Sequence, residues 1–224
     1  MNISNSVLHE RNLTILIEIA RVINTKYDLD SILKYLVNIL IQESGYDVCS
    51  ILLREGDILV NKAGYGISQE ELKKIRLKTG EGIVGHVAAT GDSILIKDTS
   101  KDPRYVHFCH DAKYLSEVAV PIMIEKELIG VLNVENKKAN SFNEEDLFFL
   151  KGVADQAAAA INNAKITESL DQFNKRLLKL YETSKEINAS LDVDSILKKI
   201  VSDVAESLKC EMVSFLYLKK GYLV

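Results

Sequence analysis

The chain has 224 residues, of which 47% are hydrophobic and 27% charged, a composition typical of a soluble globular protein. Its net charge of −4 gives no electrostatic basis for binding nucleic acid. No apolar run approaches the roughly 18 residues of a membrane span, and the N-terminus lacks the pattern of a secretion signal. Three cysteines, an odd number and widely separated, predict a reducing, cytoplasmic compartment without a disulfide framework.

The N-terminal part of the chain is predicted to form two helices. A stripe of apolar residues at helical spacing indicates a first helix over about residues 7–26, with Leu13, Leu16, Ala20 and Ile23 on its buried face. An aspartate, Asp28 or Asp30, is expected to cap a second helix, and Gly45 to end it.

The rest of the first 190 residues alternates between short strands and helices. The expected elements are strands over 48–53 and 58–62, short helices over 68–75 and 82–90, a strand over 93–96, an irregular loop over 98–113, and a hairpin over 117–124 and 128–135. Asn143 precedes three carboxylates and is expected to cap a long helix that runs to about Asn188. This order predicts an α+β fold, with a central antiparallel sheet flanked by helices.

An internal repeat relates the two ends of the chain. Ile23 recurs as Ile187, an offset of 164, and the segment DLDSILK at 28–34 recurs at the same offset as DVDSILK at 192–198. The register holds from a helix, through a turn and into a strand, which indicates two copies of one unit. Residues 191–224 are therefore expected to be the truncated start of a second domain.

The second half of the long helix carries a heptad seam, with apolar residues separated by alternating steps of four and three. Such a seam needs a partner. The same helix of a second chain, in a parallel homodimer, is the expected partner, and packing on its own domain is the alternative. The residues expected in the dimer contact are Leu170, Phe173, Leu177, Leu180 and Ile187.

Three local motifs together resemble the GAF domain family, over about residues 20–165. They are TGEGIVGHVAATG at 79–91, KDT at 97–99 followed by DPRY at 102–105, and AVPI at 119–122 with LIGVLN at 128–133 and Phe142. The resemblance implies a GAF fold with the long N- and C-terminal helices on one face of the sheet. The predicted organisation is an N-terminal helix over 1–25, a GAF domain over 26–165, a coiled-coil linker helix over 166–190, and the start of a second GAF domain over 191–224.

The resemblance also implies a function. GAF domains serve as sensory modules of cytoplasmic signalling proteins, so a non-catalytic module is expected that binds a small ligand, or dimerises, to control an output domain outside this chain. The ligand and any cofactor are left open. The pocket would lie between one sheet face and the helices and loop that cover it. The residues expected to line it are Ser50, Leu52, Ile83, Val84, Val87, Asp98, Tyr105, Cys109, His110, Tyr114, Glu117, Ala119 and Asn133.

Two ligand classes have partial sequence support. Cyclic-nucleotide-binding GAF domains carry a pattern that this chain matches at Asn136-Lys137, Phe142 and Asp146, but Leu147 replaces its final Glu.

The second class is a bilin or haem. Phytochrome-like GAF domains attach a bilin to a Cys-His pair, which Cys109-His110 resembles, although Tyr114-Leu115 follows one residue too late.

Two enzymatic interpretations match the sequence only in part. One GAF-like branch reduces free methionine sulfoxide through paired thiols, for which the domain offers only Cys49 and Cys109. The segment Gly80–Gly85 matches the dinucleotide fingerprint GxGxxG, but the basic residues before it do not read as a buried strand. The histidines show no spacing typical of a metal site.

Overall fold

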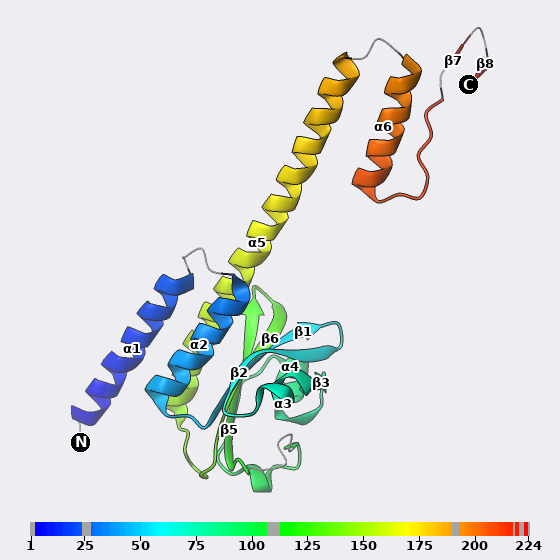
Figure 1. Cartoon of the computed structure of the whole chain (residues 1–224). Helices are drawn as coiled ribbons and strands as arrows, with labels where there is room; N and C mark the ends of the chain where they lie inside the picture. The colour runs from blue at the N-terminus through cyan, green and yellow to red at the C-terminus, as the bar shows by residue number, and fades with distance from the viewer. Residues whose placement is uncertain are drawn as a thin grey trace. The chain divides into compact units, whose positions relative to one another are not determined.

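A computed structural model describes residues 3–23, 28–106, 113–189, 193–216, 218–219 and 222–223. The chain divides into two compact units, residues 1–164 and 165–224. The first unit is built on a six-stranded antiparallel sheet with the strand order β3-β2-β1-β6-β5-β4 (Figure 1).

The elements follow the predicted order. They are α1 (Ile3–Ile23), α2 (Leu29–Ser44), β1 (Val48–Glu55), β2 (Ile58–Tyr65), α3 (Gln69–Lys74), β3 (Arg76–Lys78), α4 (Gly82–Thr90), β4 (Ile94–Ile96), the short 3₁₀ helix η1 (Thr99–Lys101), β5 (Ser116–Ile124), β6 (Glu127–Asn136) and α5 (Glu144–Ala189). The four central and longer strands, β1, β2, β5 and β6, extend beyond their predicted bounds because the pairing with neighbouring strands continues past the alternating apolar residues.

Local capping sets the ends of the helices. Asp28 caps α2 by accepting a hydrogen bond from the backbone N–H of Ser31 (3.0 Å), and Gly45 ends that helix in the left-handed region with φ of 70°. At the start of α5, the side chain of Asn143 accepts a hydrogen bond from the N–H of Glu145 (2.7 Å). The predicted caps of both helices are therefore confirmed.

Residues 76–78 form a strand that the sequence analysis does not predict. They form β3, an edge strand that pairs antiparallel with β2 and buries only its middle residue, Leu77. A strand with a single buried side chain shows no repeated alternation of apolar and polar residues, so it cannot be recognised from the sequence. The glycine-rich segment after β3 leads from this antiparallel edge strand into α4, so it lacks the parallel strand–helix–strand setting of a dinucleotide site.

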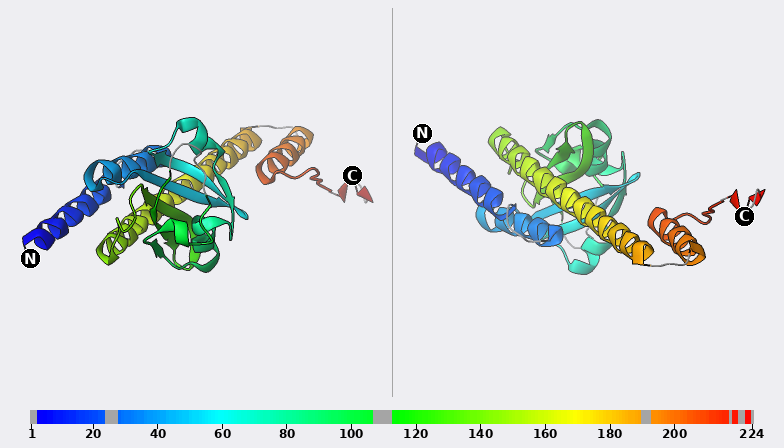
Figure 2. Two further views of the ribbon diagram at one scale, coloured as in Figure 1. Left: turned by 90° about the horizontal axis from the view of Figure 1, so that it is seen from below. Right: turned by 90° about the horizontal axis from the view of Figure 1, so that it is seen from above.

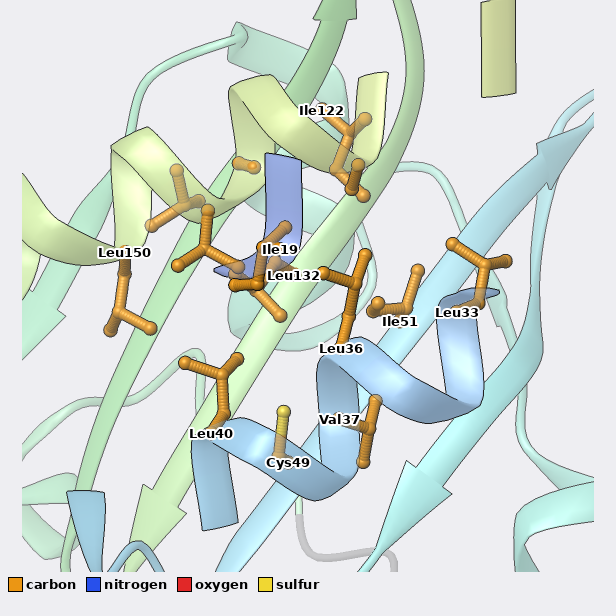
Figure 3. Close-up of a cluster of buried hydrophobic side chains, with 14 of the residues drawn as sticks. Ile19, Leu33, Leu36, Val37, Leu40, Cys49, Ile51, Ile122, Leu132 and Leu150 are labelled. Carbon is orange, nitrogen blue, oxygen red and sulfur yellow. The ribbon is translucent and has the colours of Figure 1, made fainter. Parts of the chain in front are cut away.

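Two apolar layers cover the two faces of the sheet (Figures 1 and 2). Helices α1, α2 and the first part of α5 pack on one face, as predicted for the long helices, and α4 packs on the other. In the larger layer, Ile19 of α1, Leu36 of α2 and Leu150 of α5 meet the side chains of Ile51 and Leu132 from the central strands (Figure 3). Burial of this kind contributes roughly 1.5–3 kcal/mol per large side chain.

Helix α1 buries a different stripe from the one read in the sequence. Ile15, Ile19 and Ile23 face the core, whereas Leu13 is 59% exposed. The helix thus has two apolar stripes, and only Ile23 belongs to both. Pattern alone cannot rank two such stripes, because the choice depends on the surface against which the helix packs.

The second unit contains the C-terminal part of α5, helix α6 (Val193–Leu208) and a short antiparallel pair, β7 (Leu218–Lys219) and β8 (Tyr222–Leu223). Shifted back by 164, the bounds of α6 coincide with those of α2. The β7–β8 pairing, shifted likewise, reproduces the pairs Arg54–Leu59 and Glu55–Ile58 of the first hairpin. Among the described residues, no helix is long and apolar enough to cross a membrane.

Candidate ligand-binding site

A small cavity lies on the α4 side of the sheet, beneath α4 and the chain that follows η1. Its free volume is about 40 Å³, room for a few atoms or waters, since a single water needs roughly 10–15 Å³ by this measure. We call it the sheet cavity. Its lining residues are Val48, Ser50, Leu52, Ile67, Ile75, Leu77, Ile83, Val84, Tyr105, Val106, Tyr114, Glu117, Asn133 and Glu135.

The floor of the sheet cavity carries a cluster of buried polar side chains. Glu117 of β5 stands directly opposite Glu135 of β6 in the antiparallel register. Asn133 lies two residues before Glu135 and so points to the same face, and Ser50 of β1 is its cross-strand partner. Glu117 and Asn133 are only 3% and 4% exposed. We call Glu117, Asn133 and Glu135 the carboxyl cluster.

Hydrogen bonds satisfy this cluster only in part. The side-chain amide of Asn133 donates to Oε1 of Glu135 (3.1 Å), and the hydroxyl of Tyr105 donates to Oε2 of the same carboxyl (3.3 Å). Oε2 of Glu117 and Oδ1 of Asn133 have no hydrogen-bond partner among the described residues, although both atoms are buried. A buried acceptor left unpaired costs about 1–3 kcal/mol, so the cluster is suited to accept hydrogen bonds from a bound group.

Burial changes the acidity of the cluster. It raises the pKa of Glu135 to about 7, against the smaller opposing effect of its bonds from Tyr105 and Asn133. Burial, and then the negative charge of Glu135, raise the pKa of Glu117 well above its usual value. Two neighbouring buried carboxyls resist full ionisation, so the pair retains a proton near neutral pH.

The structure brings most of the expected site residues together. Those that line the sheet cavity are Ser50, Leu52, Ile83, Val84, Tyr105, Tyr114, Glu117 and Asn133. Val87 and Ala119 lie in the apolar layer of the same sheet face, outside the cavity wall. Cys109 and His110 lie outside the described residues.

Asp98 does not contribute to the cavity lining. Its side chain accepts a hydrogen bond from the backbone N–H of Ser100 (3.2 Å) and pairs with Lys101 (2.8 Å). It therefore caps η1 and does not face the cavity.

Sequence reasoning missed Glu135, the second carboxyl of the cluster. The available signal was its place two residues after Asn133 within one predicted strand, because such residues share a face. It also missed lining residues without a polar signal, namely Val48, Ile67, Ile75, Leu77 and Val106.

The residues that match the cyclic-nucleotide pattern have structural roles. The side chain of Asn136 accepts a hydrogen bond from the backbone N–H of Asp47 (2.9 Å). Phe142 is buried with its ring centroid 5.4 Å from that of Tyr46. Asp146 accepts a hydrogen bond from the backbone at the start of α5 (2.9 Å). Asn136 and Phe142 thus contact the segment just before β1, and Asp146 bonds to the start of its own helix. None of the three lines the sheet cavity.

The thiol and metal chemistry considered above has little support in the described part of the chain. Cys49 is fully buried on the α2 side of the sheet, and burial raises the pKa of its thiol. Cys210 is exposed in the second unit. No group of three or more His, Cys, Asp or Glu residues that could hold a metal occurs among the described residues.

Comparison with known proteins places these features in context. A family model described as "GAF domain" matches residues 26–162. The dual 3′,5′-cyclic-AMP and -GMP phosphodiesterase 11A of Takifugu rubripes is 28% identical over 148 residues, which are 63% of this chain and 16% of that protein. The chain thus spans about a sixth of the length of this relative.

Solved structures share the fold. The GAF domain of an Acinetobacter phosphoenolpyruvate-protein phosphotransferase matches with a TM-score of 0.64 at 29% identity, covering 69% of this chain and 94% of the other. A free methionine-R-sulfoxide reductase of Neisseria meningitidis, solved in complex with its substrate, matches with a TM-score of 0.64 at 21% identity, covering 70% and 91%. At that identity the second match shows the fold alone.

Proposed function

Because the chain belongs to the GAF domain family, we propose that it is a sensory module that binds a small molecule in the sheet cavity and relays binding through α5. The observation that carries the proposal is the carboxyl cluster, where Glu117 and Asn133 each hold a buried oxygen that finds no hydrogen-bond donor in the described part of the chain. A buried acceptor without a donor destabilises the fold, and a bound ligand that donates hydrogen bonds would remove that cost. The signalling role is supported by the relative that degrades cyclic nucleotides.

Helix α5 offers a route for the signal. Its first part packs on the sheet through buried side chains that include Leu150, Val153 and Ile161. The same helix continues to Ala189 without a break. A ligand that changes the packing of the sheet would bias the position of α5, and a continuous helix carries a small rotation to its far end.

We further propose that the C-terminal part of α5 forms a parallel homodimer. Leu170, Phe173, Leu177 and Leu180 are 47–57% exposed, although they are large apolar residues at heptad spacing. An exposed apolar seam of this kind is stabilised by a second helix. Ile187 continues the spacing within α5, and its side chain lies outside the described residues.

Residues 191–224 are proposed to begin a second GAF domain. The support is the correspondence of α6 with α2, and of the β7–β8 register with the β1–β2 register, at one offset of 164. The output domain and the cytoplasmic setting remain part of this proposal.

Two alternatives lead to different outcomes. A bilin or haem sensor would use Cys109 and His110, and mixing with biliverdin, phycocyanobilin or haem would then give a coloured complex. A methionine sulfoxide reductase would consume free methionine sulfoxide in a coupled assay. Cys49 argues against the reductase, because it faces α2 rather than the sheet cavity and its thiol resists ionisation.

The binding proposal is tested by releasing and identifying small molecules that copurify with the full chain, and by thermal unfolding with a metabolite library. A ligand at a hundred times its Kd stabilises the native state by about 2.7 kcal/mol. Asn133→Leu should abolish that stabilisation, whereas Asp98→Asn, outside the cavity, should preserve it. If no copurified or added compound stabilises the chain, the module serves for association only.

The seam is tested by analytical ultracentrifugation of two matched variants. Leu177→Lys places a charge in the seam and should convert dimer to monomer. Leu178→Lys places the same charge one residue away, on a side chain that is 63% exposed, and should leave the dimer intact. A monomeric wild-type chain at micromolar concentration would refute the proposed homodimer.

A further inference from the structure

The side chains of the carboxyl cluster lie next to one another on the floor of the sheet cavity. Glu117 and Glu135 face each other across the β5–β6 pair, and Asn133 lies beside Glu135 on the same face. The two unpartnered oxygens belong to side chains that are more than nine-tenths buried and line the cavity. A group that enters here meets two oxygen acceptors to which no other described residue donates a hydrogen bond.

The charge around the cluster has one sign. Among the described residues that line the cavity, two are carboxyls and none is Lys, Arg or His. Asp102 lies close enough for its charge to raise the pKa of Glu117 further, and the guanidinium of Arg104 is held by Asp102 (2.7 Å). A bound phosphate or carboxylate would face this charge without a counter-ion, which is strongly unfavourable in a buried site.

The wall around the cluster is apolar. Leu52, Ile83, Val84 and Ile67 line the cavity together with the ring of Tyr114. Such a wall suits a short hydrocarbon body, and the small free volume restricts the group at the cluster to a compact one.

From these features we propose that the sheet cavity selects a small organic cation, an aliphatic primary amine whose ammonium group docks among Glu117, Asn133 and Glu135. This inference rests on the proposed function, because it names the ligand class of the same cavity. An ammonium group has three donors and no acceptor, so it can bond to the free oxygens of Glu117 and Asn133 and to the Glu135 carboxylate. Its charge also relieves the repulsion between the two carboxyls.

Proton release should accompany binding. Without ligand the carboxyl pair keeps a proton near neutral pH, and an adjacent ammonium ion favours the ionised form of both carboxyls. Binding therefore expels about one proton into solvent and becomes tighter as the pH rises from 6 to 8. The other titratable groups beside the pair are Tyr105, Tyr114 and Asp102. Burial raises the pKa of Tyr105, and the hydrogen bond from Arg104 lowers the pKa of Asp102, so neither of these two is expected to change its ionisation in that range.

The experiment is isothermal titration calorimetry of the full chain with straight-chain alkylamines from methylamine to hexylamine. Alcohols and carboxylates of the same chain lengths serve as matched probes. Each titration is repeated in two buffers of different ionisation enthalpy, which reports the number of protons released. We expect saturable binding of amines, no binding of the alcohols and carboxylates, and release of about one proton per amine at pH 7.

Variants of the two carboxyls test whether the amine binds at the carboxyl cluster. Glu117→Gln keeps the size of the side chain but removes its charge, and should weaken amine binding at least about thirty-fold. Glu135→Gln should weaken amine binding to a similar degree, so the test does not depend on one variant that could fail to fold. Circular dichroism checks that both variants are folded. Glu127→Gln removes an exposed carboxyl from the start of β6 and should bind as the wild type does.

The outcomes separate this inference from the function on which it rests. If alcohols or carboxylates bind as well as amines, or if both Gln variants bind normally, the inference is wrong. If no amine binds but another compound stabilises the wild type and not Asn133→Leu, the inference fails and the proposed sensory function stands. If no compound of any class binds, both fail.

Discussion

The raised pKa of Glu135 predicts a measurable dependence of stability on pH. In the unfolded chain this carboxyl has its ordinary pKa near 4.5, and in the folded chain its pKa is about 7. Because the folded value is higher, the proton stabilises the fold fully below about pH 4.5, and this stabilisation is lost as the pH rises through 7. The difference between the two pKa values corresponds to about 3 kcal/mol.

The Glu135→Gln variant removes this titration. Its single amide oxygen can accept only one of the two hydrogen bonds from Tyr105 and Asn133, a loss that shifts the free energy of unfolding by the same amount at every pH. The free energy of unfolding of the variant, relative to wild type, should therefore rise by about 3 kcal/mol between pH 4.5 and pH 8. The pKa of Glu117 should fall in the variant, since a neighbouring charge is gone, and this acts in the same direction. Taking the difference between variant and wild type cancels the contributions of the carboxyls outside the carboxyl cluster.

Urea denaturation at several pH values measures the effect, with midpoints and slopes fitted for both proteins. Glu127→Gln provides the matched control, because this residue is exposed at the start of β6 and lies outside the carboxyl cluster. A Glu135→Gln difference that changes by less than about 1 kcal/mol over the range would mean that Glu135 titrates as an ordinary carboxyl. The reasoning about the cluster would then be refuted.

Three further predictions concern packing and thiols. Gly85→Ala should destabilise the chain by about 1–3 kcal/mol in urea denaturation, because the new Cβ would lie 2.5 Å from the carbonyl oxygen of Lys78; a neutral result would contradict that contact. Leu40→Ala, at a fully buried site in α2, should cost about 2–5 kcal/mol by the same measurement, and a smaller loss would mean that the core relaxes around it. Peptide mapping after thiol labelling should find Cys210 modified in the native chain and Cys49 modified only after unfolding; rapid native labelling of Cys49 would disprove its burial.

Features that depend on neighbours in the sequence could be predicted well. Asp28, Gly45 and Asn143 act within one helical turn of their own positions, so the bounds of α2 and the start of α5 follow from local patterns. The alternation of apolar residues likewise predicts the two hairpins, and the family motifs predict the sheet with its long helices on one face.

Features that depend on distant parts of the chain could not be derived in this way. β3 is a strand because β2 offers it an edge, and α1 buries Ile15 and Ile19 because those side chains meet the sheet and α2. The carboxyl cluster depends on the register that sets Glu117 opposite Glu135, which no local pattern records. Local interactions specify where a helix begins and ends. Burial and strand pairing across the sheet determine which face of each element packs in the core and which polar side chains lie next to each other.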